Sequence, residues 1–376
     1  MIRVFETFSG IGAQTKALAN TKVSHSVVAT SEWDINAIIS YANIHCKKEM
    51  LKIVIPSYDE MIEYLSGFTF SSDGKKPIKS IKRLPKNRIM QLYVATIASN
   101  NFGSISDISA ESLPDFDLLT YSFPCQAISL QGKKEGLVKG SKTSSSLLWE
   151  VERILLELSE QKRLPKYLLM ENVANLLSKN FIPFFNTWLD FLDSLGYKTS
   201  YGILTASDFN CPQNRNRAFA ISVLGDQKID LPVGKRTLLT LNDFVEDTSP
   251  QKYYLDHLLH KVDFKNKKVK NSGICSTLLK NYTTFQSENY VYFLNGISPT
   301  ITANGAQSRL KIIDHKNKLR YLMPIELWRL MGFTDNDFYA AHSMGISEVI
   351  LKKQAGNSIC VPVLEAIFKK MFKNNK

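Results

Sequence analysis

The feature that most constrains this chain is a short apolar run that ends at a proline and a cysteine. Residues 118–121 read Leu-Leu-Thr-Tyr, which is typical of a short buried strand. Pro124 cannot continue a strand ladder, so the strand has to end before Cys125. A thiol at the carboxyl end of a parallel strand lies where open α/β sheets place their chemistry. A small buried core cysteine is the alternative, but the strand, the proline and the polar segment that follows favour a nucleophile.

A second pattern lies at the start of the chain. Residues 2–8 read as an apolar strand, residues 9–13 as a glycine turn, and residues 14–18 as the start of a helix. Strand, glycine turn and helix open a nucleotide-binding α/β fold, because glycine lets the backbone approach a ligand closely. Thr15 stands at the third glycine position, so the fingerprint of a dinucleotide site is incomplete.

Glu32 and Trp33 follow a second apolar strand at residues 27–29. A carboxylate at the end of the second strand suits the two hydroxyl donors of a ribose. The indole of Trp33 is able to stack on an adenine ring. A helix N-cap and a core tryptophan are the alternative interpretation, and taken in isolation the two residues favour neither.

Composition narrows the class of protein. A chain of 376 residues, 44% of them hydrophobic, fits one large domain with a smaller partner. We find no apolar stretch of membrane-spanning length and no leader with a charged start, so we expect a cytoplasmic protein with no membrane partner. The five cysteines include no CxxC pair, which favours free thiols over disulfides or zinc. We expect no metal.

The charge of the chain indicates its partner. A net charge of +12 favours a polyanion, although a lysine-rich surface that reflects an AT-rich genome is the alternative. Seven lysines and arginines crowd into residues 71–88, where a solvated surface is the default interpretation and a loop flanking DNA is the alternative. Residues 225–294 interleave lysines with aromatic residues, a mixture that fits phosphate contacts together with base contacts.

Two further blocks place charged side chains at strand ends. Residues 167–170 form an apolar strand that ends at Glu171 and should lie parallel to the strand before Cys125, so that both groups face one cleft. Arg215 and Arg217 stand at alternate positions before another apolar run, and we expect them to project to the same face. The alternatives are a helix cap for the glutamate and a surface ion-pair strip for the arginines.

In their order along the chain, these blocks resemble the DNA (cytosine-5)-methyltransferases. The matching motifs are Phe-Ser-Gly-Ile-Gly (8–12), Phe-Pro-Cys-Gln (123–126), Glu-Asn-Val (171–173), Gln-x-Arg-x-Arg (213–217) and Gly-Asn-Ser (356–358). The resemblance extends from Phe8 to Pro362. The local sequence around Cys125 and Glu171 is most similar to that of the mollicute enzymes that methylate CG.

The resemblance implies an α/β fold, a Rossmann-like S-adenosylmethionine-dependent methyltransferase sheet with a smaller target recognition domain. Residues 1–225 and 350–376 would form the catalytic and S-adenosylmethionine-binding domain, and residues 226–349 the target recognition domain with its bracing segments. The implied activity is transfer of a methyl group from S-adenosylmethionine to C5 of a flipped cytosine in a specific duplex sequence. Such an enzyme would belong to a restriction–modification system.

The resemblance also implies roles for single residues. Cys125, as the thiolate, attacks C6 of the cytosine, and Glu171 bonds N3, because C6 is a poor electrophile until N3 is protonated or hydrogen-bonded. Arg215 and Arg217 reach the nucleotide, one at the cytosine O2 and the other at Glu171 or a phosphate. With these roles, double-stranded DNA is the expected partner of a monomer, and a cognate restriction endonuclease would act separately.

The remaining implied contacts fall into two groups. The donor site would comprise Phe8, Gly10, Gly12, Glu32, Trp33, Asp107, Ile108, Pro124, Asn357 and Ser358. The DNA contacts would include Gln126, Ser129, Lys133 and Thr300.

Three other functions compete with this one. A related tRNA cytosine-5 methyltransferase shares the Pro-Cys-Gln and Glu-Asn-Val motifs, but it usually lacks a full recognition lobe and carries a Cys-Phe-Thr signature that this sequence does not have. A catalytically silent DNA-binding relative would not need Cys125 and Glu171. A nicotinamide oxidoreductase is disfavoured by Thr15 in the glycine pattern and leaves the later motifs unexplained.

Overall fold

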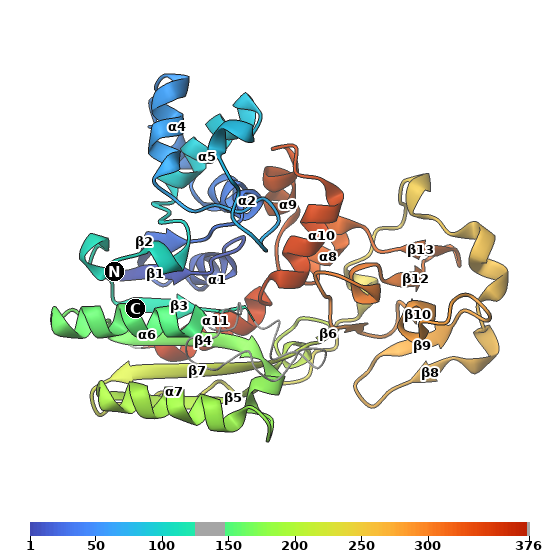
Figure 1. Ribbon diagram of the computed structural model, residues 1–376. Coiled ribbons are helices and arrows are strands. Elements are labelled where there is room, and N and C mark those ends of the chain that lie inside the picture. The colour runs from blue at the N-terminus through green and yellow to red at the C-terminus, as the bar shows by residue number, and fades with distance from the viewer. Residues whose placement is uncertain (125–146, 374–376) are drawn as a thin grey trace. The chain divides into compact units, whose positions relative to one another are not determined.

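The computed structural model describes residues 1–124 and 147–373 (Figure 1). Contacts within the chain divide it into two compact units, each built from separate pieces of sequence. The first unit comprises Met1–Leu204, Arg217–Pro232 and Leu364–Lys376, and the second comprises Thr205–Asn216 and Val233–Val363.

The first unit is built on a six-stranded sheet of order β2-β1-β3-β4-β7-β5. Its strands are β1 (Ile2–Thr7), β2 (His25–Ser31), β3 (Leu118–Tyr121), β4 (Tyr167–Val173), β5 (Tyr197–Thr205) and β7 (Asn216–Leu224). Strand β1 pairs in parallel with β2 and β3, β3 pairs in parallel with β4, and β7 runs antiparallel to β4. The carboxyl ends of β2, β1, β3 and β4 therefore meet at one edge of the sheet, as the predicted α/β fold requires.

One face of this sheet is covered by α6 (Leu148–Glu160) and α7 (Ile182–Ser194), whose apolar side chains pack on alternate strand residues such as Tyr121 and Met170. Within this core the indole Nε1 of Trp188 donates a 3.1 Å hydrogen bond to the hydroxyl of Tyr121. Because both groups are buried, this bond satisfies polar atoms that would otherwise destabilise the core.

The opposite face carries α1 (Ala13–Thr21) and the last helix, α11 (Val361–Met371). Asn20 of α1 donates a 2.7 Å hydrogen bond to Glu365 of α11, and the rings of Tyr167 and Phe372 meet edge to face with centroids 5.3 Å apart. The end of the chain is therefore part of the first unit. Four more helices complete this unit beside β2: α2 (Ile35–His45), α3 (Lys47–Met50), α4 (Tyr58–Ser66) and α5 (Lys86–Ala98).

The second unit contains a five-stranded sheet of order β13-β12-β10-β9-β8 and a two-stranded ladder of β6 and β11. The strands are β6 (Gln213–Asn214), β8 (Lys268–Val269), β9 (Cys275–Leu278), β10 (Tyr290–Phe293), β11 (Ser298–Pro299), β12 (Lys311–Ile313) and β13 (Leu319–Tyr321). Its helices are α8 (Pro324–Arg329), α9 (Asp335–His342) and α10 (Glu348–Asn357). These strands are short and are separated by loops. Hydrophobic periodicity alone could therefore not reveal them in the sequence.

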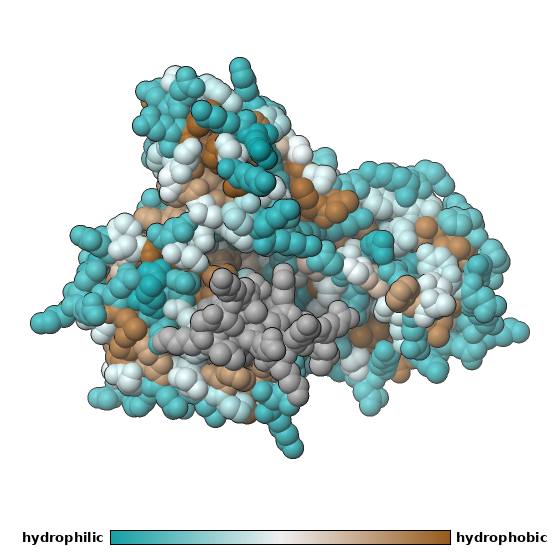
Figure 2. Space-filling model, in the orientation of Figure 1, coloured by the Kyte–Doolittle hydropathy of each residue, from teal (hydrophilic) through white to brown (hydrophobic). Residues whose placement is uncertain are grey.

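Figure 2 shows that hydrophobic side chains are scattered among hydrophilic ones on the face it presents. Leu51, Val233 and Leu238 are among the most exposed large hydrophobic residues. Within the described ranges, the helices are all too short or too polar to traverse a bilayer.

A buried ion pair joins β13 to α8 in the second unit. The guanidinium of Arg320 donates to both carboxylate oxygens of Glu326, at 2.9 and 2.7 Å, and both side chains are fully buried. The same carboxylate accepts hydrogen bonds from the backbone amides of Met323 and Glu246. Glu326 therefore fixes the entry to α8 and the loop that carries Glu246.

We expect Glu326→Ala to lower the free energy of unfolding of the second unit by about 3–5 kcal/mol, because it removes the carboxylate that accepts two hydrogen bonds from the buried Arg320 and leaves this charge with the longer 3.8 Å contact to Asp314. Urea unfolding followed by circular dichroism measures this. Asp193→Ala removes an exposed partner of Lys198 and serves as the control that should barely change stability. Equal midpoints for the two variants would show that the buried pair does not stabilise the fold.

Candidate active site

The glycine turn after β1 adopts the left-handed backbone that glycine tolerates best. The φ angles are 52° at Phe8, 54° at Gly10 and 79° at Gly12. A Cβ on Gly12 would lie 2.4 Å from Nε2 of His45, so this glycine is required by packing against α2. A Cβ on Gly10 would meet no atom within 4 Å, so open space lies over this residue. The turn therefore offers a backbone cradle at Gly10.

Glu32 ties the end of β2 to this turn. Its Oε2 accepts a 2.9 Å hydrogen bond from the amide of Gly10, and its Oε1 accepts bonds from the amides of Trp33 and Asp34 at 2.8 and 2.9 Å. Burial raises the pKa of the Glu32 carboxyl to about 7, against the opposing effect of these amides. Burial makes the Glu32 carboxyl group costly to ionise, and open space lies beside it. Hydrogen bonds from the hydroxyl groups of a ligand would stabilise its ionised form.

Asn101 supports Glu32, and sequence reasoning missed it. Its Oδ1 accepts a 2.9 Å bond from the amide of Glu32, and its Nδ2 donates a 3.0 Å bond to the carbonyl of the same residue. The side chain is buried, so these bonds replace water. An isolated asparagine between a helix and a glycine gave no signal in the sequence.

Asp107 and Ile108 belong to a braced turn. Asp107 ends a short 3-10 helix (Ile105–Asp107) and is exposed, whereas Ile108 is buried. The guanidinium of Arg153 on α6 donates to the carbonyl oxygens of Ile105 and Ile108, at 3.2 and 2.8 Å. Glu157 in turn accepts a 2.7 Å bond from Arg153. The turn is thus held in place by the helix that covers the sheet.

The ends of β3 and β4 are tied together through the predicted Glu-Asn-Val motif. Nδ2 of Asn172 donates a 3.1 Å hydrogen bond to the carbonyl of Phe123, the residue before Pro124. This bond fixes the point at which the chain leaves β3. The predicted Cys125, together with Gln126, Ser129 and Lys133, lies outside the described residues.

Glu171 lies next to Asn172 and forms an ion pair with Arg217. Nε of Arg217 is 3.2 Å from Oε1 of Glu171, and the two side chains are only 18% and 12% exposed. Residue 171 pairs with Phe219 and Val173 pairs with Arg217, so the two charged side chains are diagonal neighbours on one face of the antiparallel ladder. The arginine therefore holds the carboxyl group at the carboxyl end of β4.

Arg215 precedes strand β7 and binds other groups than Arg217 does, and the projection of both arginines to one face stays a prediction. Strand β7 begins at Asn216, and the amide of Arg215 instead donates to the carbonyl of Gln213 in a tight turn. The buried guanidinium donates to carbonyl oxygens at Ile301 (2.7 Å), Gly356 (3.1 Å) and Ser358 (2.7 Å).

The Gly-Asn-Ser motif lies at the end of α10 in the second unit. Asn357 is the last residue of the helix and is exposed, whereas Ser358 is buried. A Cβ on Gly356 would lie 2.3 Å from the backbone nitrogen of Ala303, so the helix end presses directly on the segment after Thr300. Arg215 and the glycine thus fix this helix end against residues 301–303.

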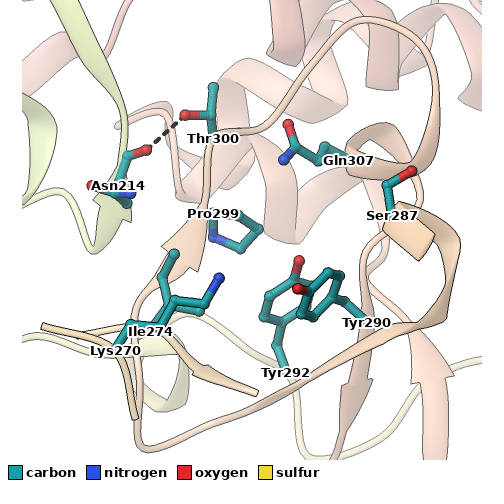
Figure 3. Close-up of a pocket in the computed structure, with 9 residues that line it drawn as sticks. All are labelled: Asn214, Lys270, Ile274, Ser287, Tyr290, Tyr292, Pro299, Thr300 and Gln307. Carbon is teal, nitrogen blue, oxygen red and sulfur yellow. Dashed lines mark hydrogen bonds between the residues drawn. The ribbon is translucent and has the colours of Figure 1, made fainter. Parts of the chain in front are cut away.

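Thr300 lines a pocket of about 250 Å³ in the second unit (Figure 3). The other lining residues are Asn214, Lys270, Ile274, Ser287, Tyr290, Tyr292, Pro299 and Gln307. The rings of Tyr290 and Tyr292 are stacked with centroids 6.2 Å apart, and Nζ of Lys270 lies 5.2 Å from the centroid of Tyr290. None of the lining residues within the described parts of the chain is acidic, and these residues offer hydrogen-bonding groups and one positive charge.

A charge cluster of a buried lysine, a partly buried glutamate and an exposed arginine lies next to the lining residue Ser287. Glu288 accepts a 2.6 Å bond from Arg309 and lies 3.3 Å from the ammonium of Lys311, which also donates to the carbonyl of Glu288 at 2.7 Å. Burial lowers the pKa of Lys311. This cluster fixes the 3-10 helix that carries Ser287 (Gln286–Asn289), next to the one that carries Gln307 (Ala306–Ser308).

Comparison with known proteins places these features in a family. Residues 57–373 match the C-5 cytosine-specific DNA methylase family. The type II methyltransferase M2.ScrFI of Lactococcus lactis subsp. cremoris is 39% identical over the full length of both chains. The orphan methyltransferase M.SssI of Spiroplasma monobiae, a mollicute, is 39% identical over 98% of this chain and 97% of its own.

Solved structures agree on the fold. The S. pombe Dnmt2 methyltransferase superposes with a TM-score of 0.65 over 99% of each chain, at 18% sequence identity. A putative DNA modification methyltransferase encoded within an E. coli prophage gives a TM-score of 0.55 over 99% of each chain, at 16% identity. These likenesses confirm the predicted α/β methyltransferase fold. Because residues 57–373, most of its length, match that family, this chain belongs to the C-5 cytosine-specific DNA methylase family.

Proposed function

We propose that this DNA (cytosine-5)-methyltransferase uses Cys125 as its nucleophile and Glu171 as the acid that engages N3 of the flipped cytosine. The observation that carries the proposal is the bond from Asn172 to the carbonyl of Phe123. It joins the strand end that bears Glu171 to the strand end two residues before Cys125. A thiol and a carboxyl group at adjacent strand ends can reach opposite sides of one pyrimidine.

Glu171 and Arg217 have distinct tasks in this proposal. Hydrogen bonding at N3 by Glu171 draws electrons from the ring and makes C6 open to attack by the Cys125 thiolate. Arg217 orients the carboxyl group through their 3.2 Å contact. Once C5 carries its methyl group, loss of the C5 proton to water expels the sulfur and restores the thiolate. Arg215 would act indirectly, because its hydrogen bonds hold Ile301 and the end of α10 in place.

The family implies S-adenosylmethionine as methyl donor, and the residues around Gly10 fit it. The open space over Gly10 and the adjacent Glu32 carboxylate suit a nucleoside whose ribose hydroxyls donate hydrogen bonds. Trp33 would stack on the adenine. When bound, the sulfonium group supplies an electrophilic methyl group. The other proposed donor contacts are Phe8, Gly12, Asp107, Ile108, Pro124, Asn357 and Ser358.

The second unit would recognise the DNA. A cytosine in a duplex is stacked and must be extruded before C6 can be attacked, so the enzyme also has to hold the rest of the site. The pocket that contains Tyr290, Gln307 and Thr300 offers donors and acceptors for base edges or phosphates. Gln126, Ser129 and Lys133 would contact DNA beside the nucleophile. We further propose that the protein acts as a monomer in the cytoplasm, with any cognate restriction endonuclease acting separately.

Trapping on DNA tests the assignment of nucleophile and acid. A duplex containing 5-fluorocytosine cannot lose its C5 substituent, so we expect wild-type protein and S-adenosylmethionine to form a covalent complex visible by denaturing electrophoresis. Cys125→Ser should form none while still binding DNA, and Glu171→Gln should form it about 10²–10⁴-fold more slowly.

Glu160→Gln is the matched control for the glutamate, because Glu160 is exposed on α6 and should leave the rate unchanged. Covalent trapping by Cys125→Ser would remove that thiol from the mechanism. Methylation of tRNA but not of duplex DNA would favour the related tRNA enzyme, and bisulfite sequencing of DNA from an expressing host would give the recognised sequence.

Affinity for S-adenosylmethionine should depend on pH through Glu32. The carboxylate accepts the ribose hydroxyls, and its pKa is about 7, so affinity should be constant well above pH 7 and fall by up to about tenfold per pH unit below it. Calorimetric titration measures this. Glu32→Gln should bind more weakly at pH 8 and show a flat profile.

Glu6 provides the control for this pH dependence. Burial also raises its pKa to about 7, but its carboxyl group bonds internally to Thr15 and Tyr41. Glu6→Gln should therefore keep the pH profile of the wild-type protein. A profile that persists in Glu32→Gln and disappears in Glu6→Gln would contradict the assignment.

Gln307 should contribute to the choice of DNA sequence. Its amide lies at the rim of the pocket (Figure 3). Removing a base-edge contact costs about 1–3 kcal/mol of discrimination between the right and the wrong base. Gln307→Ala should therefore reduce the ratio of kcat/KM on the cognate duplex to kcat/KM on a single-mismatch duplex by roughly 5- to 150-fold. Gln286→Ala, at an exposed neighbouring site outside the lining, should leave the ratio unchanged. Identical ratios for both variants would exclude Gln307 from recognition.

A further inference from the structure

The segment that follows α4 and includes the first turn of α5 carries a concentration of positive charge that the methyl-transfer site does not use. Residues 71–88, here called the basic loop, contain seven lysines and arginines and one acidic residue. The charged residues that are exposed are Lys75, Lys76, Lys79, Lys82, Arg83 and Lys86. None of the salt bridges within residues 1–124 and 147–373 involves Lys75, Lys79 or Lys82.

The single carboxylate of the basic loop is used to shape its turn. Oδ1 of Asp73 accepts hydrogen bonds from the amides of Lys75 and Lys76, at 2.8 and 3.2 Å. These amide bonds lower the pKa of Asp73. Asp73 therefore builds the backbone from which the lysines project, and the surface of the loop keeps a large positive excess.

The basic loop is also ordered by its own hydrogen bonds. Oγ of Ser71 donates to the carbonyl of Lys76 at 2.7 Å and accepts from the amide of Gly74 at 2.9 Å. The amide of Ile78 donates to the carbonyl of Phe70 at 2.9 Å, and Ile81 is buried. A fixed backbone presents the lysines in defined directions, which lowers the entropy lost when they bind a partner.

The basic loop is attached to the edge of the sheet where the chemistry is proposed. The amide of Ser71 donates to the carbonyl of Trp33 at 2.7 Å, and the carbonyl of Ser71 accepts from the amide of Ile35 at 2.9 Å. These contacts lie just beyond the carboxyl end of β2. In the order β2-β1-β3-β4, neighbouring strands are about 4.8 Å apart, so the end of β2 lies roughly 14 Å from the end of β4 and Glu171.

We infer that the basic loop binds the sugar-phosphate backbone of duplex DNA outside the recognised bases. The inference rests on the proposed function, because DNA must reach the same sheet edge to deliver its cytosine. Since about 3.4 Å of helix axis separates successive phosphates of a strand, a distance of roughly 14 Å corresponds to about four base pairs. Lysines on a loop that is anchored at that distance contact phosphates and add affinity that is independent of sequence.

The test is the salt dependence of DNA binding by the full chain. We take the triple variant Lys75→Gln, Lys79→Gln and Lys82→Gln and measure binding to a 40-base-pair duplex by fluorescence anisotropy from 50 to 200 mM salt. The slope of log K against log [salt] is negative, and each lost phosphate contact reduces its magnitude by about 0.9. We expect the magnitude to fall by about 2–3, equally on cognate and non-cognate duplexes, and the preference for the cognate sequence to stay unchanged.

The matched control removes the same charge from the opposite edge of the sheet. Lys22, Lys162 and Lys166 are exposed and lie just before β2 or β4, at the amino ends of these strands. Their triple glutamine variant should keep the wild-type slope. A wild-type slope in the basic-loop variant, or equal decreases in both variants, would overturn the inference.

The outcome separates this inference from the proposed function. Wild-type protein that fails to trap a 5-fluorocytosine duplex contradicts the proposed function whatever the slopes are. Normal trapping on a short duplex at low salt, together with a reduced slope on the long duplex, supports the role of the basic loop. A change in sequence preference in the basic-loop variant would contradict backbone binding.

Discussion

The hydrogen bond from Asn172 to the carbonyl of Phe123 is the constraint on which the rest of the active site depends. Parallel pairing of β3 with β4 brings the two strands side by side, but it does not determine how the chain leaves them. The asparagine determines this for β3, and the neighbouring Glu171 is oriented from the other side by Arg217. Two consecutive residues of one strand therefore hold the end of β3 and the carboxyl group at the end of β4, and a shift of one register would break both contacts.

Two carboxyl groups at the same sheet edge illustrate how environment assigns tasks. Glu171 faces a guanidinium, which directs the carboxyl group. Glu32 accepts hydrogen bonds from backbone amides, and burial raises its pKa to about 7. The arrangement at Glu171 favours a fixed group that hydrogen-bonds to a polar ring. The arrangement at Glu32 favours a hydrogen-bond acceptor, because ligand hydroxyls stabilise the carboxylate in place of the water that burial removes. Residue type alone does not distinguish these cases.

Much of the first unit could be predicted from the sequence because its strands are apolar runs that end in marked residues. The runs at 118–121 and 167–170, the glycine turn and Glu32 all lie where these patterns indicate. The tasks of Asn101 and Arg215 could not be predicted, because both act on backbone atoms far away in the sequence. The cluster of Glu288 and Lys311 could not be predicted either, because in a lysine-rich chain the sequence does not distinguish a buried lysine from an exposed one. The proposed roles of the site residues remain predictions.

The position of the last helix has a consequence for biosynthesis. Helix α11 packs beside α1 on the sheet that the first two hundred residues build, yet it leaves the ribosome only after the stretch Val233–Val363 has been made. At usual translation rates this interval is on the order of ten seconds. During that time one face of the nascent sheet lacks its cover, and the apolar surface that receives α11 is open to chaperones or to other chains. A slower ribosome would lengthen this exposure, so the yield of folded enzyme should be sensitive to codon usage across the second unit.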